Sequence, residues 1–190
     1  MVQEYQLGEH REDNGMKMPS DSELTFLFEG DERQLQQFIV DHRETLERHR
    51  FVLADELAIE KQIPIVFAYV YSVIVDWGEF DEEIVRLFGK RLPDELVEVT
   101  ATEKGLDVTY NGHLHSIALT FSGKDRYITI RGFQELIRDK YEIRLFEASY
   151  LSDTHEFLIL PKRQWEELDA RYPARNREMF RVIDGELDFP

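Results

Sequence analysis

Five acidic residues lie within eight positions near the middle of the chain, beside two aromatic residues. The acidic residues are Asp76, Glu79, Asp81, Glu82 and Glu83, and the aromatic residues are Trp77 and Phe80. Carboxylates attract a basic protein from a distance, and aromatic side chains beside them anchor it once water leaves the contact. The cluster therefore predicts a surface that binds a basic partner. The alternative is that Asp81, Glu82 and Glu83 fill the first turn of a helix, where negative charge complements the helix dipole.

Two histidines, His113 and His115, flank one leucine in a predicted strand. Side chains two positions apart in a strand point to the same face, so the two imidazoles could bind a transition metal together with a third ligand. No nearby residue supplies that ligand at a typical spacing. The sequence therefore favours two exposed polar side chains and predicts no metal site.

A hydroxyl, a carboxylate and an imidazole stand together at Ser152, Asp153 and His155. Catalytic triads are assembled from distant segments around a fixed nucleophile, because adjacent side chains seldom converge on one point. The simpler interpretation is a loop whose short polar side chains cap its own backbone. His155 stays, with His113 and His115, a candidate polar site for an enzyme.

Another pair, His42 and His49, falls seven residues apart in a predicted helix, so both side chains are expected on one face. Imidazole titrates near neutral pH, and such a pair could sense pH. The alternative is that each ring borders the apolar stripe of the helix and is half-buried.

Missing residues and motifs exclude several classes of chemistry. The chain has no cysteine, which excludes disulfides, a thiol nucleophile, and thiolate ligands for zinc or iron–sulfur clusters. It has no nucleophile elbow, phosphate-binding glycine loop, zinc-protease helix or dinucleotide fingerprint. The acidic cluster lacks the spacing of a calcium loop. The sequence predicts no cofactor, and so many carboxylates offer no way to choose one acid–base pair.

Negative charge is concentrated in the first two-thirds of the chain. Residues 1–123 carry 25 Asp and Glu against 11 Lys and Arg, a net charge of −14, whereas residues 124–190 carry 14 against 12, a net charge of −2. Such a field repels nucleic acid, because phosphate binding needs Lys and Arg. The expected partner is a basic protein. The one basic run, at Arg171, Arg175, Arg177 and Arg181, is expected to lie against the acidic half.

Helical periodicity dominates the first half. Apolar residues recur at spacings of three and four over residues 35–57, which predicts a helix that starts after Asp31, has Gln34 as its capping-box partner and could break near Phe51. Residues 63–75 are rich in β-branched and aromatic side chains, so a buried strand and a helix are both open, and we favour the helix. Residues 80–92 form a further amphipathic pattern that ends at a glycine and a proline.

After Pro93 the periodicity changes to two. Residues 95–102, 106–110 and 114–121 alternate, and the Asn111-Gly112 pair between the last two runs predicts a hairpin with a type I′ turn. A helix capped by Thr129, strands at residues 141–148 and 155–160, and a helix opened by Pro161 follow. Residues 179–183 could add an edge strand.

The predicted fold class is α+β, with a helical N-terminal half packed on a largely antiparallel sheet of order β-β-β-α-β-β-α. We expect a flexible arm at residues 1–22, a helical acidic region at 23–93 and a sheet region at 94–190, or one compact domain over 23–190. No signal peptide is recognised, and the most apolar stretch, residues 63–75, is too short to span about 30 Å of hydrocarbon. A cytoplasmic protein without membrane contact is therefore expected.

Three functions are compatible with these features. The leading hypothesis is a protein-binding or inhibitory module, of the immunity or antitoxin kind, that covers a basic surface of its partner. One alternative is an enzyme that acts on a small substrate with His and carboxylates in a cleft between the helical half and the sheet. The other is a scaffold that associates through an exposed sheet edge or through residues 63–75.

Overall fold

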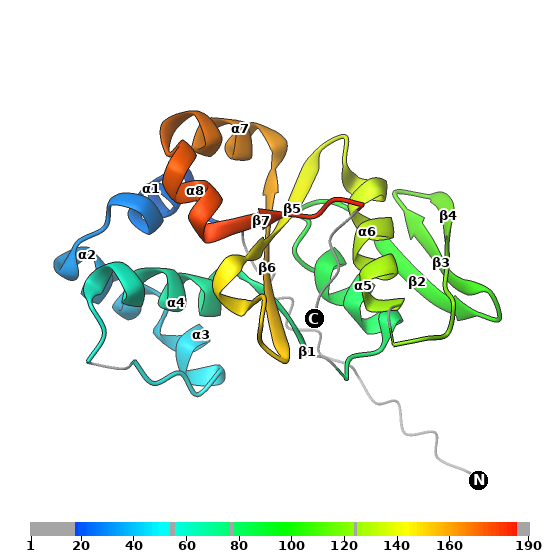
Figure 1. Ribbon diagram of the computed structural model, residues 1–190, viewed down its shortest axis with the longest axis horizontal. Helices are drawn as coiled ribbons and strands as arrows, with labels where there is room; N and C mark the ends of the chain where they lie inside the picture. Colours follow the sequence, from blue (N-terminus) through cyan, green and yellow to red (C-terminus); the bar gives the residue numbers. More distant parts are fainter. Residues whose placement is uncertain (1–17, 54–55, 77, 124, 186–190) are drawn as a thin grey trace, which may run out of the picture.

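The computed structural model describes residues 18–53, 56–76, 78–123 and 125–185. The helices are α1 (Asp21–Glu29), α2 (Glu32–Asp41), α3 (Arg43–Arg48), α4 (Ile59–Tyr71), α5 (Asp81–Gly89), α6 (Asp125–Ile137), α7 (Lys162–Arg171) and α8 (Pro173–Met179), with a short 3-10 turn η1 (Glu147–Ser149). The strands are β1 (Val73–Asp76), β2 (Val97–Thr102), β3 (Gly105–Tyr110), β4 (His113–Ala118), β5 (Tyr141–Phe146), β6 (Thr154–Pro161) and β7 (Phe180–Val182). The predicted α+β class is confirmed (Figure 1).

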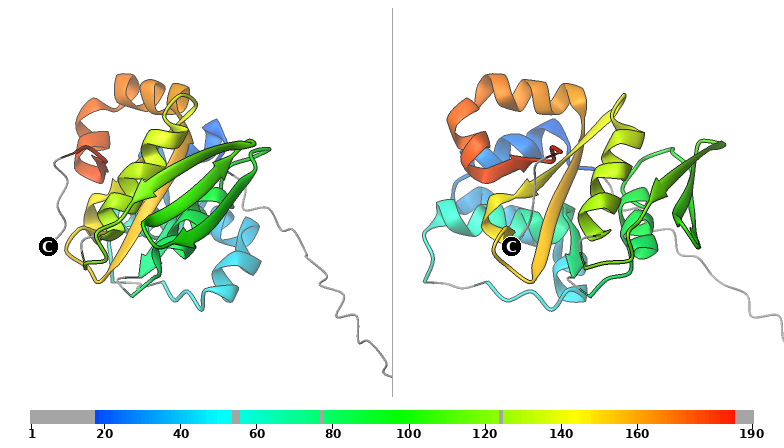
Figure 2. Two further views of the ribbon diagram at one scale, coloured as in Figure 1. Left: turned by 90° about the vertical axis from the view of Figure 1, so that its right-hand side faces the viewer. Right: turned by 45° about the vertical axis from the view of Figure 1, so that its right-hand side comes forward.

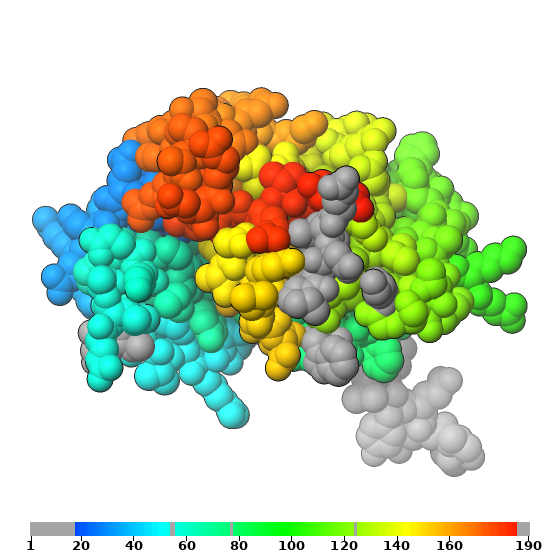
Figure 3. All heavy atoms as spheres, in the orientation of Figure 1, coloured from blue at the N-terminus to red at the C-terminus, as the bar shows by residue number. Residues whose placement is uncertain are grey.

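Two antiparallel sheets divide the molecule into layers. Sheet A has the strand order β1-β6-β5-β7, and sheet B has the order β2-β3-β4. Helices α5 and α6 lie between the two sheets, whereas the remaining helices gather on the other side of sheet A (Figure 2). Sheet B projects from one end of the molecule (Figure 3).

Sheet A separates two hydrophobic clusters, because successive side chains of a strand point to opposite faces. On β6, Phe157 and Ile159 join the cluster formed with α5, α6 and sheet B, whereas Leu158 and Leu160 join the cluster formed with α1, α2, α4 and α7. Covering both faces explains why β6 is apolar without alternation. Both clusters contain residues from either side of residue 93, and the division of the chain there stays a prediction.

The helical half begins earlier than predicted. Residues 21–22, expected in a flexible arm, are the first residues of α1, which the prediction lacks. Ser20 caps this helix and forms a capping box with Glu23. Residues 1–17 of the expected arm lie outside the described part of the chain.

The long helix predicted from residue 35 to residue 57 is wrong in its length. Its start is confirmed, because the Asp31 side chain accepts a hydrogen bond of 2.8 Å from the Gln34 amide and the capping box is complete. The helix ends at Asp41, however, and α3 begins after a break at His42. The apolar spacing continues through this break, so periodicity alone could not reveal it.

Residues 63–75 contain both structures that the sequence left open. Residues 63–71 are the larger part of α4, and β1 starts at Val73 after Ser72. The helix prediction is therefore correct up to Tyr71 and wrong beyond it. Most of the segment is buried, so it is not an exposed association surface. In the described residues, no helix is long and apolar enough to cross a membrane.

The second half follows the predicted order β-β-β-α-β-β-α from β2 to α7, with α8 and the edge strand β7 after it. The Asn111-Gly112 hairpin is confirmed, since both residues have positive φ, 49° and 82°. The predicted cap at Thr129 is wrong, because α6 starts four residues earlier, at Asp125, and buries Thr129 in its second turn.

Two glycines let sheet B lie close to the helices beneath it. A Cβ atom at Gly89 in α5 would meet Val97 of β2 at 2.8 Å, and one at Gly132 in α6 would meet Ile117 of β4 at 2.9 Å. Both distances are below normal contact. Sheet B therefore rests on α5 at one edge and on α6 at the other.

Candidate protein-binding surface

Helices α5 and α6 run side by side in the same direction, so their N-terminal ends meet at one end of the molecule (Figure 1). At the start of α5, Asp81 Oδ1 accepts a hydrogen bond of 2.5 Å from the Thr129 hydroxyl of α6. Further along, the rings of Phe88 and Phe133 stack with centroids 5.8 Å apart. Asp81 therefore turns into the helix contact and does not point into solvent with the rest of the acidic cluster.

The loop that leads into α6 folds around one buried carboxylate. Asp125 accepts hydrogen bonds from the Thr120 amide at 2.9 Å, the Thr120 hydroxyl at 2.7 Å and the Ser122 amide at 3.1 Å. Burial alone would raise the pKa of Asp125, but these donors hold it below its ordinary value. Between them, Phe121 has a φ of 57°, a region that residues other than glycine seldom occupy, and its side chain is 68% exposed.

Two aromatic side chains are thus exposed at this end, because Phe80, directly before α5, is 78% exposed. The two helix starts are close enough to interact electrostatically. Burial raises the pKa of Asp81, and the negative charge of Asp125 raises it further. Large exposed aromatic side chains are typical anchors of surfaces that bind another protein.

Two carboxylates of the predicted cluster are partly neutralised within α5. The Arg86 guanidinium lies 3.5 Å from Glu82 and 3.2 Å from Glu83, and Lys90 lies 3.7 Å from Glu83. These pairs run along one exposed helix face, where each contributes little to stability. The alternative interpretation, acids that complement the start of a helix, fits Asp81, Glu82 and Glu83, which fill the first turn of α5.

The other two carboxylates stay available at the surface. Asp76 accepts a hydrogen bond of 2.9 Å from the Gly78 amide, and neither Asp76 nor Glu79 forms an ion pair with a described residue. Trp77 lies outside the described residues. The candidate surface is therefore defined by Asp76, Glu79, Phe80 and Phe121.

The three candidate histidines are not brought together. His113 and His115 are exposed on β4, as expected. His155 is buried on β6, where its Nε2–H donates to the Tyr150 carbonyl at 3.3 Å, and burial lowers its pKa. Within the described part of the chain, no group of three or more His, Cys, Asp or Glu side chains could bind a metal.

The pair His42 and His49 does not share a helix face, because the helix breaks at His42. Instead, His42 Nε2 lies 3.2 Å from Glu23 Oε1 of α1, and the Tyr71 hydroxyl of α4 donates to the same oxygen. Burial would raise the pKa of Glu23, but hydrogen bonds from Ser20 and Tyr71 lower it. Sequence reasoning missed this network, although the spacing of Ser20 and Glu23 carries the signal of a capping box.

Three of the four arginines near the end form described pairs, and these three divide between the two halves. Arg171 lies 2.7 Å from Glu29 of α1, and Arg175 donates to the Phe28 carbonyl, so these two do lie against the acidic half. Arg181 pairs with Glu147 of its own half at 2.5 Å. In the described part of the chain, none of the four arginines pairs with Asp76 or Glu79.

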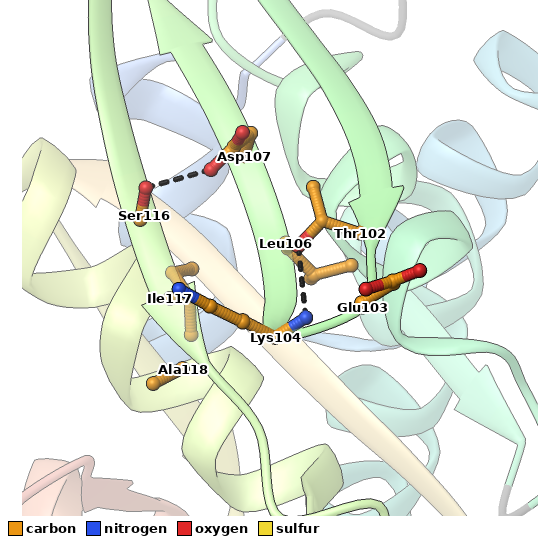
Figure 4. A pocket seen from close by; sticks show the side chains of 8 residues that line it. All are labelled: Thr102, Glu103, Lys104, Leu106, Asp107, Ser116, Ile117 and Ala118. Atoms are coloured by element: carbon orange, nitrogen blue, oxygen red, sulfur yellow. Dashed lines mark hydrogen bonds between the residues drawn. The ribbon is translucent and has the colours of Figure 1, made fainter.

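A hollow of about 470 Å³ lies beside the turn between β2 and β3 (Figure 4). It is lined by Thr102, Glu103, Lys104, Leu106, Asp107, Ser116, Ile117 and Ala118. A second, of about 80 Å³, lies between α1 and α7. No histidine lines either hollow, so neither of the two has the geometry of an enzyme cleft with a catalytic His.

A scan against protein-family models and searches of curated proteins and solved structures found no match to this chain.

Proposed function

We propose that this protein binds a basic protein through the surface of Asp76, Glu79, Phe80 and Phe121 and thereby covers a functional region of that partner. The observation that carries the proposal is the pairing of two exposed aromatic rings with two carboxylates that lack an ion pair among the described residues. The rings supply apolar anchors, and the charges raise the rate of encounter with a basic surface.

The surface is held in place by groups that do not need a partner. The Asp81–Thr129 hydrogen bond joins the two helices, and the Asp125 carboxylate fixes the loop that carries Phe121. A preorganised surface loses less conformational entropy on binding than a flexible one. An immunity or antitoxin protein, which blocks the phosphate-binding patch of a nucleic-acid-directed toxin, would use such a surface.

The experiment starts by capturing basic proteins from the native lysate on the immobilised full chain. The dissociation constant of each purified candidate is then measured over a salt series. We expect the affinity to fall as ionic strength rises, because screening weakens attraction between exposed charges. Binding that ignores ionic strength would count against the proposal, as would equal binding to polylysine, which has no surface for the aromatic rings.

Matched variants locate the contact. Phe80→Ala should weaken binding about tenfold or more, whereas Val52→Ala, which truncates an apolar side chain that is 86% exposed after α3, should not. The double change Asp76→Asn and Glu79→Gln should slow association more than Glu44→Gln and Glu47→Gln, which remove the same charge from α3. If the two double variants slowed association equally, the contact would lie elsewhere.

A further inference from the structure

Strand β4 is an edge strand without the usual protection. Its six residues, His113–Ala118, include no proline and no Asp, Glu, Lys or Arg, and all except Ile117 are exposed. Natural edge strands are commonly blocked by a charge, a proline or a bulge, because free backbone groups pair with other chains. The most exposed apolar side chain of β4 is Leu114, at 66%.

The backbone register shows which groups of β4 are free. Tyr110 and His113 face each other across the two-residue turn, so residues 113, 115 and 117 bond to β3. The Leu119 amide, which donates to the Lys104 carbonyl at 3.1 Å, continues this alternation. The amides and carbonyls of Leu114, Ser116 and Ala118 therefore point away from β3, and no described backbone group bonds to them.

The same strand forms one wall of the larger hollow (Figure 4). Ser116 Oγ donates a hydrogen bond of 2.6 Å to Asp107 Oδ1 of β3, so this carboxylate lies directly behind the free edge. Glu103 and Lys104 also line the hollow. With two carboxylates and one ammonium, the hollow suits a cation better than an anion.

We propose that an extended, basic segment of the partner adds to β4 as a fourth strand of sheet B, and that its Lys or Arg side chain beside Ser116 enters the hollow toward Asp107. The basic character of the segment rests on the proposed function. Strands lie about 4.8 Å apart, so its backbone would run about 10 Å from that of β3, a gap that a long basic side chain and the Asp107 side chain bridge together. Backbone bonds give such additions affinity, and side-chain pockets give specificity.

The added strand would be continuous with the proposed binding surface. Only Leu119 and Thr120 separate β4 from Phe121, so one partner could contact both. The two contacts are nevertheless separable, because Phe80 and Asp76 belong to other elements and contribute nothing to the β4 edge.

The test uses the full chain and a labelled ten-residue peptide in which Lys alternates with Thr. Fluorescence anisotropy at low salt should show binding, and a peptide in which Glu replaces every Lys should not bind. A Lys–Thr peptide whose outward amides are N-methylated should bind at least tenfold more weakly, because it cannot donate to β4. Equal binding of the methylated peptide, or no binding of the Lys–Thr peptide, would overturn the proposal.

Variants of the chain test the two parts of the contact. Ser116→Pro removes one outward amide and should abolish peptide binding, whereas Ser116→Thr should retain it. Asp107→Asn should weaken binding about tenfold, and Lys104→Gln should strengthen it, because they remove opposite charges from the hollow. The methylated peptide keeps the test valid if Ser116→Pro fails to fold. Unchanged affinity in both charge variants would refute the role of the hollow.

Phe80→Ala distinguishes this inference from the proposed function, because it should leave peptide binding unchanged while it weakens binding of the whole partner. If Ser116→Pro lost peptide binding but still bound the whole partner, strand addition by the partner would be refuted and the proposed function would stand. Sedimentation of the free chain tests whether β4 pairs with a second copy of the chain instead. A dimer that Ser116→Pro dissociates, without peptide binding, would assign the edge to a second copy and overturn the proposal.

Discussion

The two sides of sheet A use their charged residues differently. On the side covered by α7, the buried Arg144 guanidinium bonds to Asp169 at 2.8 and 2.7 Å and to Glu142 at 2.6 Å, and it lies 4.2 Å over the Trp165 ring. Around the starts of α5 and α6, by contrast, Asp76, Phe80 and Phe121 are exposed and Glu79 is half-buried. The charges beside α7 hold the fold together, whereas we propose that Asp76 and Glu79 are available to a partner.

This comparison predicts that substitutions on the α7 side change stability, whereas substitutions at the α5 and α6 starts change binding with little effect on stability. Four substitutions test this contrast, and the expected change in stability decreases from the first to the last.

Arg144→Ala should destabilise the chain by about 3 kcal/mol, because it leaves Glu142 and Asp169 without their shared cation and removes the contact with Trp165. Urea unfolding followed by circular dichroism measures this loss. The control is Arg163→Ala, which breaks an exposed pair with Glu167 at 3.4 Å and should cost less than about 1 kcal/mol. Equal losses in the two variants would contradict the contrast between the two sides.

Gly132→Val should cost about 2 kcal/mol, because its side chain would overlap Ile117 and lift β4 from α6. Gly123→Ala is the matched control, since nothing lies within 4 Å of the Cβ position there. Hydrogen exchange should show the loss of protection mainly in sheet B. Uniform loss over both sheets would mean that sheet B does not rest on this glycine contact.

Glu156→Gln should stabilise the chain at pH 7 by a smaller amount. Burial raises the pKa of Glu156 above its ordinary value of 4.5, and no described cation pairs with it. A raised carboxyl pKa favours folding at pH below the unfolded value, and this contribution is lost as the pH rises through the folded value. Thermal unfolding should therefore show the gain at pH 7 and little difference at pH 4. A gain that persists at pH 4 would exclude this electrostatic cause.

Phe80→Ala should change the free energy of unfolding by less than about 0.5 kcal/mol, because its ring is 78% exposed. The same variant is expected to weaken partner binding. Urea unfolding and the binding assay together test whether the α5 and α6 starts are separate from the stability of the fold. A large loss of stability would show that Phe80 serves the fold and would remove it from the binding surface.

Local patterns predicted some elements well. The Asn111-Gly112 turn and its flanking alternation depend only on neighbouring residues, and the same is true of the capping box at Asp31. The break at His42 was not predictable, because it depends on Glu23 and Tyr71, which are 19 and 29 residues away. The predicted cap at Thr129 is wrong for a different reason, since α6 starts at Asp125, whose carboxylate accepts hydrogen bonds from Thr120 and Ser122 in the preceding loop.

The candidate surface also combines features that residue types predict with features that only the fold decides. The cluster of five acids and its excess of negative charge could be read from residue types alone, because charge does not depend on the fold. The direction of each carboxylate could not: Asp81 turns toward Thr129, Glu83 toward Arg86, and Asp76 stays at the surface. Phe121 entered the surface only through the loop around Asp125.

Residue order alone thus determined the fold class, the hairpin and the sign of the charge, since periodicity, turn chemistry and composition act over a few neighbouring positions. Packing decided which acids are free, which helix breaks and which strand edge stays open. These outcomes depend on contacts between segments far apart in the chain, where burial and hydrogen bonding outweigh local preference.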